Sequence, residues 1–279
     1  MSSKSRLLDM QRSWASKLGA VVDHRNYFSS VAANLHAPLS KRASRAFSMG
    51  SGSELRDTAS RPAKMKALHS SSALAVNVFD YWTERNPSPL LAALELSLTA
   101  ASIDFEAQFP TGLDGKPPNL DIGLRLDSGK IVGVESKFSE WLSPKSPNKA
   151  PFKPKYFADS AQHWSTAGLV ACQVLAEEMR SGARHFRYLD APQLLKHALG
   201  LATQHRGNFD LYYVYYDFSG PETVPHRAEL EEFEALVRSD FRFRWISYQD
   251  VYSRLVRLIG PENAAYTNYL RERYFLNAV

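Results

Sequence analysis

The stretch of sequence that decides the fold runs over residues 118–138 and reads PNLDIGLRLDSGKIVGVESKF. Apolar and polar residues alternate over 120–126 and again over 131–138, which is the pattern of half-buried β-strands. Asp127, Ser128 and Gly129 stand between them, and a three-residue loop with glycine in the left-handed conformation is a common hairpin connection. The stretch therefore predicts an antiparallel β-hairpin.

The register of this hairpin decides which polar side chains meet. The three-residue loop pairs Leu126 with Lys130. Counting back from this pair sets Asp121 opposite Glu135. Lys137 is two residues beyond Glu135, so both side chains leave the same face of the strand. A two-residue loop would shift the pairing and separate the carboxylates, but it would also mix apolar with polar side chains. We therefore expect Asp121, Glu135 and Lys137 to converge.

These residue types suit phosphodiester hydrolysis with a divalent cation. Mg²⁺ and Mn²⁺ prefer hard oxygen ligands such as the carboxylates of Asp121 and Glu135. The charge of Lys137 beside an attacking water would favour the developing negative charge. The same register sets Gly123 opposite Gly133, which predicts a bare patch where a backbone or a phosphate approaches closely. An ordinary hairpin with a polar outer face is the alternative, because the pattern is short.

The rest of the chain predicts an α/β protein. A strand over 103–109 precedes the hairpin, and strands over 209–218 and 241–247 follow it among helices. Residues 40–62 are rich in Ser, Gly and Arg and predict a linker or an irregular segment. Apolar spacing predicts helices over 4–35, 73–82, 88–101, 159–180, 191–204, 226–238, 249–258 and 262–276.

Charge divides the chain into two parts. The net charge is +5, and residues 1–66 alone hold twelve Lys and Arg against four Asp and Glu. We predict a basic, mainly helical N-terminal extension and linker over 1–66, and the main domain over 67–279. A basic arm suits a polyanion such as nucleic acid, and a solvated, partly disordered tail is the alternative.

Several classes of protein are not indicated by the sequence. The single cysteine, Cys172, has no partner for an internal disulfide or a Cys-based zinc site. No secretory signal and no run of about 20 apolar residues is present, so we expect a soluble, cytoplasmic protein without membrane contact. The eight histidines show no zinc-like spacing, and His163, His185 and His197 are expected to be structural. Phosphate-loop and dinucleotide fingerprints are absent.

The motif Asp121…Glu135-Ser-Lys137 resembles the signature of the PD-(D/E)xK nuclease superfamily, which includes restriction, repair and recombination nucleases. The run SSSALAVN over 70–77, together with PNLD over 118–121 and VESKF over 134–138, is similar to bacterial restriction-endonuclease-like proteins. Pro118 stands three residues before Asp121 rather than directly before it, at a position that the family keeps loosely. The resemblance covers the helix over 88–101 through the strand over 209–218.

The resemblance implies a restriction-endonuclease-like mixed β-sheet flanked by helices. It implies that Asp121 and Glu135 ligate Mg²⁺ or Mn²⁺ and that Lys137 orients or activates water. Such families often add a glutamate from the helix before the first core strand, and Glu95 is the candidate, with a solvent-facing role as its alternative. Some place a glutamine on a later helix, for which Gln193 is preferred over Gln173; a surface or capping role is the alternative.

A proline-rich loop over 141–156 follows the proposed catalytic strand and carries four lysines, Lys145, Lys149, Lys153 and Lys155. Such a loop could bind phosphates without reading sequence, and a mobile, solubilising loop is the alternative. Its aromatic residues could stack on bases, although aromatic residues beside prolines more often pack locally. These residues are Trp141, Phe152 and Tyr156.

The first hypothesis is therefore a Mg²⁺-dependent deoxyribonuclease in defence or DNA processing. An inactive nucleic-acid-binding protein that retains the nuclease fold is the second, and an enzyme on an unrelated α/β fold is the third. The sequence leaves open whether DNA or RNA is cut, and a homodimer is one possible assembly because restriction enzymes of this fold commonly dimerise.

Overall fold

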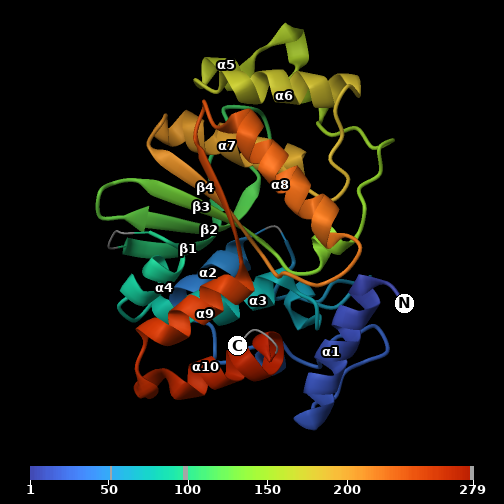
Figure 1. The fold of residues 1–279 in the computed structure, drawn as a ribbon, viewed down its shortest axis with the longest axis vertical. Helices are drawn as coiled ribbons and strands as arrows, with labels where there is room; N and C mark the ends of the chain where they lie inside the picture. Colours follow the sequence, from blue (N-terminus) through green and yellow to red (C-terminus); the bar gives the residue numbers. More distant parts are fainter. Residues whose placement is uncertain (51, 97–99, 277–279) are drawn as a thin grey trace.

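A five-stranded mixed β-sheet forms the centre of the computed structural model, which describes residues 1–50, 52–96 and 100–276 (Figure 1). The strands follow one another across the sheet in chain order; β1, β2 and β3 are antiparallel, whereas β3, β4 and β5 are parallel. Their bounds are β1 (Ala100–Gln108), β2 (Asn119–Leu126), β3 (Ile131–Lys137), β4 (Phe209–Tyr215) and β5 (Arg242–Ser247). All five predicted strands are confirmed.

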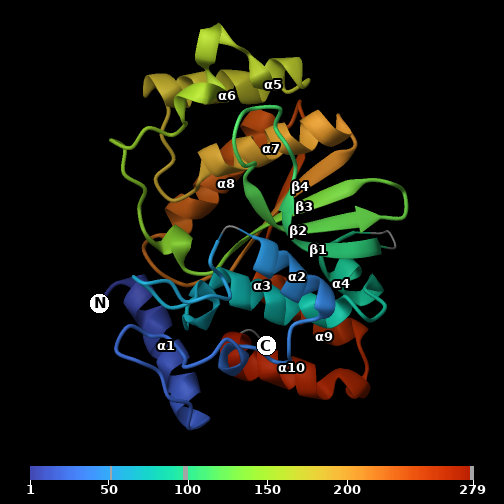
Figure 2. The same cartoon turned by 180° about the vertical axis from the view of Figure 1, so that it is seen from behind.

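Helices cover both faces of the sheet. The α-helices of the described residues are α1 (Ser3–Lys17), α2 (Lys41–Met49), α3 (Ser71–Phe79), α4 (Ser88–Ala93), α5 (His163–Thr166), α6 (Val170–Ser181), α7 (Ala191–His205), α8 (Thr223–Val237), α9 (Tyr248–Leu258) and α10 (Ala264–Leu270). Figures 1 and 2 show α7 and α8 over one face, with α6 beyond them, and α3, α4 and α9 against the other. The α/β class with a mixed sheet flanked by helices is confirmed, and this architecture is consistent with a restriction-endonuclease-like fold.

The N-terminal part packs against the body more closely than a linker would. Residues 40–62 contain α2, which begins where Ser40 Oγ accepts a hydrogen bond from the Ala43 N–H. Phe47 of this helix lies 5.6 Å from Phe105 between ring centroids. The expectation of an irregular segment is therefore wrong for 41–49, because burial of Phe47 outweighs the polar composition. The domain boundary at residue 66 stays a prediction.

Two long predicted helices are shorter in the structure. The helix expected over 4–35 ends at Lys17. The one expected over 159–180 is split into α5 and α6 by Gly168, whose φ of 86° lies in the left-handed region that glycine adopts without strain.

Among the described residues, no helix combines the length and apolarity needed to cross a membrane.

Candidate active site

The β2–β3 hairpin has the predicted register. The Leu126 N–H donates to the Lys130 carbonyl at 2.9 Å, and Gly129 adopts a φ of 78°. The ladder runs from the pair Arg125–Ile131 through Gly123–Gly133 to Ile122–Val134. The next positions along it are Asp121 and Glu135. The local turn chemistry therefore sets the two carboxylates at corresponding places on adjacent strands.

Asp121 lies at the end of the paired part of β2 and β3, next to the pair Ile122–Val134. Its carboxylate Oδ2 accepts a hydrogen bond from the backbone N–H of Ser136 at 2.7 Å. Burial, followed by the negative charge of Glu135, raises the pKa of Asp121 well above its usual value, although the Lys137 charge opposes this. An ionised Asp121 is thus costly in this position unless a further cation is present.

Glu135 and Lys137 form a buried ion pair. Lys137 Nζ lies 2.5 Å from Glu135 Oε1 and also donates to Gln193 Oε1 at 3.0 Å. Burial alone would raise the pKa of Glu135, but the charges of Lys137 and His197 outweigh it and lower that pKa to about 2. Burial would lower the pKa of Lys137, whereas the carboxylates of Glu135 and Asp121 outweigh burial and raise it. Both groups are therefore charged at neutral pH.

The structure places Gln193 beside Lys137 and adds a residue that the sequence analysis had regarded as structural. His197 is 2% exposed, and its Nε2 lies 3.0 Å from Glu135 Oε2. Gln193 and His197 are four residues apart on α7, so they share one helix face. The expectation that His197 is only structural therefore overlooks its contact with Glu135. The i, i+4 spacing from Gln193 was the signal that could have found it.

Close packing of α7 on the sheet brings these side chains to β3. A Cβ atom on Gly133 would lie 2.8 Å from Leu120 and 3.0 Å from Leu201 of α7. One on Gly200 would lie 2.3 Å from the Phe109 carbonyl oxygen. The expected bare patch at Gly133 is therefore filled by Leu120 of β2 and Leu201 of α7, because the missing side chain lets its neighbours approach closely.

The helix that was expected to carry Glu95 to the site ends too early. α4 stops at Ala93, and Glu95 adopts a φ of 60°. The Leu96 N–H donates to the Leu91 carbonyl at 2.8 Å, and the Glu95 N–H donates to the Ala92 carbonyl at 3.0 Å. This is the hydrogen-bond pattern of a Schellman C-cap, which terminates the helix. Residues 97–99 of the predicted helix lie outside the described residues.

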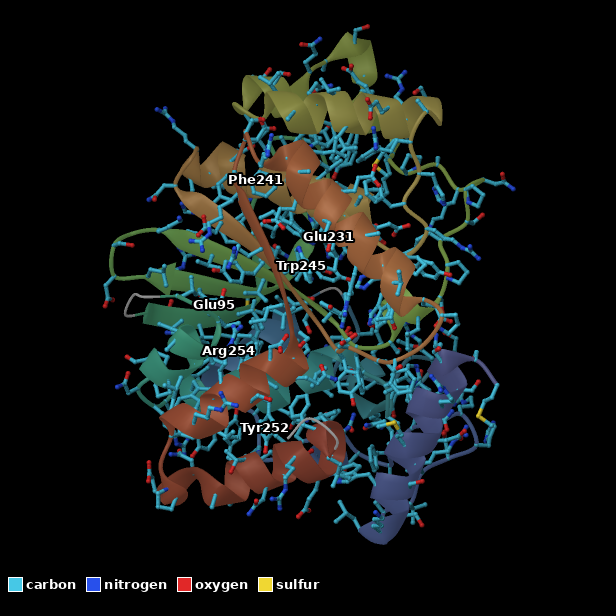
Figure 3. The ribbon with its side chains drawn as sticks, viewed as in Figure 1. Glu95, Glu231, Phe241, Trp245, Tyr252 and Arg254 are labelled. Atoms are coloured by element: carbon cyan, nitrogen blue, oxygen red, sulfur yellow. The ribbon has the colours of Figure 1, made fainter. Side chains whose placement is uncertain are left out.

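Glu95 does not lie beside the hairpin carboxylates, where the prediction had put it. Its carboxylate pairs with Arg244 at 2.7 Å and with Arg254 at 2.9 Å, and 45% of the side chain is exposed. The register of β3, β4 and β5 puts Arg244 in line with Val134, on the sheet face opposite Glu135. Figure 3 labels Glu95 and Arg254 on the side of the sheet that α9 covers.

β1 contributes a different carboxylate, that of Glu106, which lies near Asp121 and Glu135. The β1–β2 register pairs Phe105 with Ile122 and Ala107 with Leu120, which sets Glu106 opposite Asp121. Its φ of 48° is unusual for a residue other than glycine. Burial, and then the carboxylates of Glu54 and Glu135, raise the pKa of Glu106. Nothing in the alternation of β1 distinguished Glu106 beforehand.

Two carboxylates are the available protein ligands for a cation. In the described ranges, no three or more His, Cys, Asp or Glu side chains are arranged to hold a metal ion. Mg²⁺ is commonly bound through only one or two carboxylates, with waters and substrate phosphates completing the shell. Glu135 Oε2 is buried and lies 3.0 Å from His197 Nε2, but it accepts no hydrogen bond of regular geometry from the described residues. Asp121 and Glu135 therefore fit Mg²⁺ or Mn²⁺ in donor type and number.

In the loop over 141–156 the aromatic residues are packed inside the protein, whereas some of the lysines are exposed. Trp141 and Tyr156 are 1% and 5% exposed and pack within the protein, as does Phe152 against Trp164. The aromatic residues therefore pack locally rather than present faces to bases. Of the four lysines, Lys145 and Lys155 are engaged by protein groups, whereas Lys149 and Lys153 are exposed and have no such partner in the part of the chain that the structure describes.

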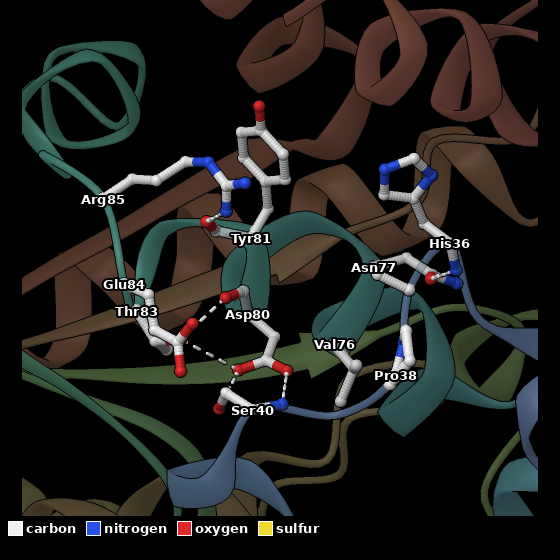
Figure 4. Close-up of a pocket in the computed structure, with 11 residues that line it drawn as sticks. His36, Pro38, Ser40, Val76, Asn77, Asp80, Tyr81, Thr83, Glu84 and Arg85 are labelled. Atoms are coloured by element: carbon white, nitrogen blue, oxygen red, sulfur yellow. Dashed lines mark hydrogen bonds between the residues drawn. The ribbon is translucent and has the colours of Figure 1, made fainter.

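A separate cavity of about 260 Å³ lies between residues 36–40 and 76–85 (Figure 4). Its Asp80 accepts hydrogen bonds from Ser40 N at 2.8 Å and Ser40 Oγ at 2.6 Å. The ring of Tyr81 lies between Tyr266 and the Arg85 guanidinium, each 4.0 Å from its centroid. These groups satisfy one another, so the carboxylates of the hairpin remain the stronger catalytic candidates.

Comparison with known proteins identifies the family of the chain. The family model described as Restriction Endonuclease associating with ARP matches residues 19–275. No curated protein and no solved structure matches the chain. Because the matched region spans nearly all of the sequence and includes every residue of the hairpin site, the protein belongs to the family of restriction endonucleases associating with ARP.

Proposed function

We propose that the protein is a divalent-metal-dependent endonuclease of the PD-(D/E)xK type that hydrolyses phosphodiester bonds of DNA, in defence or DNA processing. The observation that carries the proposal is the buried arrangement of Lys137 against Glu135 and Gln193, with Asp121 beside it. Membership in a restriction endonuclease family supports nuclease chemistry and a DNA substrate.

Asp121 and Glu135 are the residues that would hold the cation. Burial, and then the charge of the neighbouring Glu135, oppose ionisation of Asp121 and raise its pKa. A divalent cation held by the two carboxylates would offset this cost. When bound, Mg²⁺ or Mn²⁺ supplies Lewis-acid polarisation of the phosphate and a water of lowered pKa.

Lys137 acts as a hydrogen-bond donor and a fixed positive charge. Its raised pKa keeps the ammonium protonated, so it does not accept the proton of the attacking water. An ammonium has three N–H donors, and the described residues occupy two of them, through Glu135 and Gln193. The third is available to orient water or to stabilise negative charge that develops on the phosphate.

The test is incubation of supercoiled plasmid with the full chain, with Mg²⁺, Mn²⁺ or EDTA. We expect cleavage that requires the divalent ion and falls at least about 100-fold in Glu135→Gln and in Lys137→Met, the scale of losing one preorganised electrostatic group. Glu95→Gln is the matched control and should cleave like the wild type. An active homodimer would give linear product directly, and a monomer would give nicked circles first.

Each result separates the proposal from its alternatives. Plasmid bound but never cut with either ion would favour the inactive nucleic-acid-binding protein. Cleavage of an RNA duplex but not of DNA would show that the substrate is RNA. Wild-type cleavage by Glu135→Gln would overturn the proposed site.

A further inference from the structure

The loop over 141–156, which carries the four lysines, contacts α7 or the residues next to it at both ends. At its start, the Lys145 N–H donates to the Arg187 carbonyl at 2.6 Å, and Lys145 Nζ lies 3.6 Å from Asp190, the residue that caps α7. At its end, Tyr156 stacks on Trp164 with ring centroids 5.7 Å apart. Trp164 in turn donates from its indole nitrogen to a carbonyl of α7, that of Leu195, at 2.8 Å. The intervening residues therefore pass near the first turns of α7.

Three lysines in this region have no direct ion-pair partner among the described residues. Lys149 and Lys153 lie between the two anchors and are exposed. Lys196, on α7, is half-buried. Among the described residues, none of these three ammonium groups has a hydrogen-bond or ion-pair partner. Burial lowers the pKa of Lys196, and the nearby charges of Lys149 and Lys153 lower it further, although Asp190 and Glu135 oppose this. A bound anion would offset the mutual repulsion of the three ammonium groups.

The cluster adjoins the catalytic site. Lys196 directly precedes His197, which contacts Glu135, and it is three residues from Gln193, which contacts Lys137. Residues three apart on a helix are neighbours on its surface. An anion held by Lys196 would therefore lie within about one helical turn of the groups proposed to act on the scissile phosphate.

We infer that Lys149, Lys153 and Lys196 form a phosphate-binding cradle for the strand being cut, which contacts the phosphates next to the scissile one. This inference rests on the proposed function. A lysine ammonium is a point charge that binds phosphate without reading the base. Successive phosphates of one strand repeat every ~3.4 Å along a duplex axis, so a few lysines can contact adjacent phosphates. Lys145 and Lys155 are excluded from the cradle, because Asp190 and the Asp114 carbonyl already engage them.

The test measures binding of a labelled DNA duplex by fluorescence anisotropy, with the full chain in EDTA so that cleavage does not interfere. NaCl is varied to obtain the slope of log affinity against log salt. The variants are Lys149→Gln, Lys153→Gln and Lys196→Gln, singly and together. Lys155→Gln, in the same loop, and Lys17→Gln, on α1, remove the same charge elsewhere. Thermal unfolding verifies that each variant is folded.

Each cradle variant should reduce the slope by about 0.9 and weaken binding by roughly eightfold at 0.1 M salt, as expected for one lost phosphate contact. The triple variant should reduce the slope by about 2 to 3. Both controls should keep the wild-type slope. An unchanged slope in the triple variant, equal losses in the controls, or no duplex binding by the wild type would overturn the cradle.

The two proposals fail separately. Salt-sensitive binding through the three lysines without cleavage in Mg²⁺ or Mn²⁺ would retain the cradle and refute the nuclease. Metal-dependent cleavage with an unchanged salt slope in the triple variant would retain the nuclease and refute the cradle.

Discussion

Replacing Gly200 by alanine tests whether close helix–sheet packing positions the site. In an ordinary helix interior this change stabilises by about 1 kcal/mol. Here the new Cβ would lie 2.3 Å from the Phe109 carbonyl oxygen, a backbone atom that cannot rotate away. Overpacking of this kind costs roughly 1–3 kcal/mol. We therefore expect a net loss of up to about 2 kcal/mol, or a fall in Tm of up to roughly 6 °C.

The same substitution should also reduce activity, because α7 would move away from β3 and take Gln193 and His197 with it. A displacement of about 1 Å at a catalytic group can cost about 100-fold in rate. Thermal unfolding and plasmid cleavage are measured on Gly200→Ala and on Gly207→Ala, a loop position with open space around it. A higher Tm for Gly200→Ala with normal cleavage would refute the packing argument.

Three further substitutions follow from the site. Because the folded-state pKa of Asp121 is raised above 3.8, ionisation costs stability as pH rises through that pKa. In EDTA, Asp121→Asn should therefore unfold at a higher temperature than the wild type at pH 7, with a difference that shrinks towards pH 4; a constant difference would contradict this. His197→Leu should lose roughly 1–3 kcal/mol in urea unfolding, because Glu135 Oε2 stays buried without its neighbour. His197→Gln, which keeps an N–H donor, should recover most of that loss, and equal losses would argue against the contact. Glu95→Gln should lose less than about 1 kcal/mol, since its ion pairs are partly exposed, and should retain full cleavage.

The sequence predicted the parts of the site that depend on local geometry. Strand alternation and the Asp127–Gly129 turn set the hairpin register, and with it the correspondence of Asp121 and Glu135. The resemblance to nucleases then pointed to Gln193, which the structure brings to Lys137. The register could be predicted because the turn and the two strands beside it set it locally, whereas the position of Gln193 came from the resemblance alone.

Contacts between distant segments were not predictable in this way. Glu95 was assigned to the site from a helix that ends at Ala93, and a Schellman cap and two arginines hold it on the other side of the sheet. His197 meets Glu135 only because α7 packs closely over β3. α2 forms in a polar segment because the ring of Phe47 packs against the ring of Phe105, which lies far from it in the sequence. Each of these outcomes depends on tertiary packing that single-sequence periodicity does not contain.

Titration of the metal-free full chain with Mn²⁺, with the free ion followed by electron paramagnetic resonance, tests most directly whether Asp121 and Glu135 hold a divalent cation. We predict a Mn²⁺ site in the wild type that is lost in the Asp121→Asn/Glu135→Gln double variant and kept in Glu95→Gln. Equal Mn²⁺ binding by the wild type and the double variant, or none by the wild type, would contradict the account.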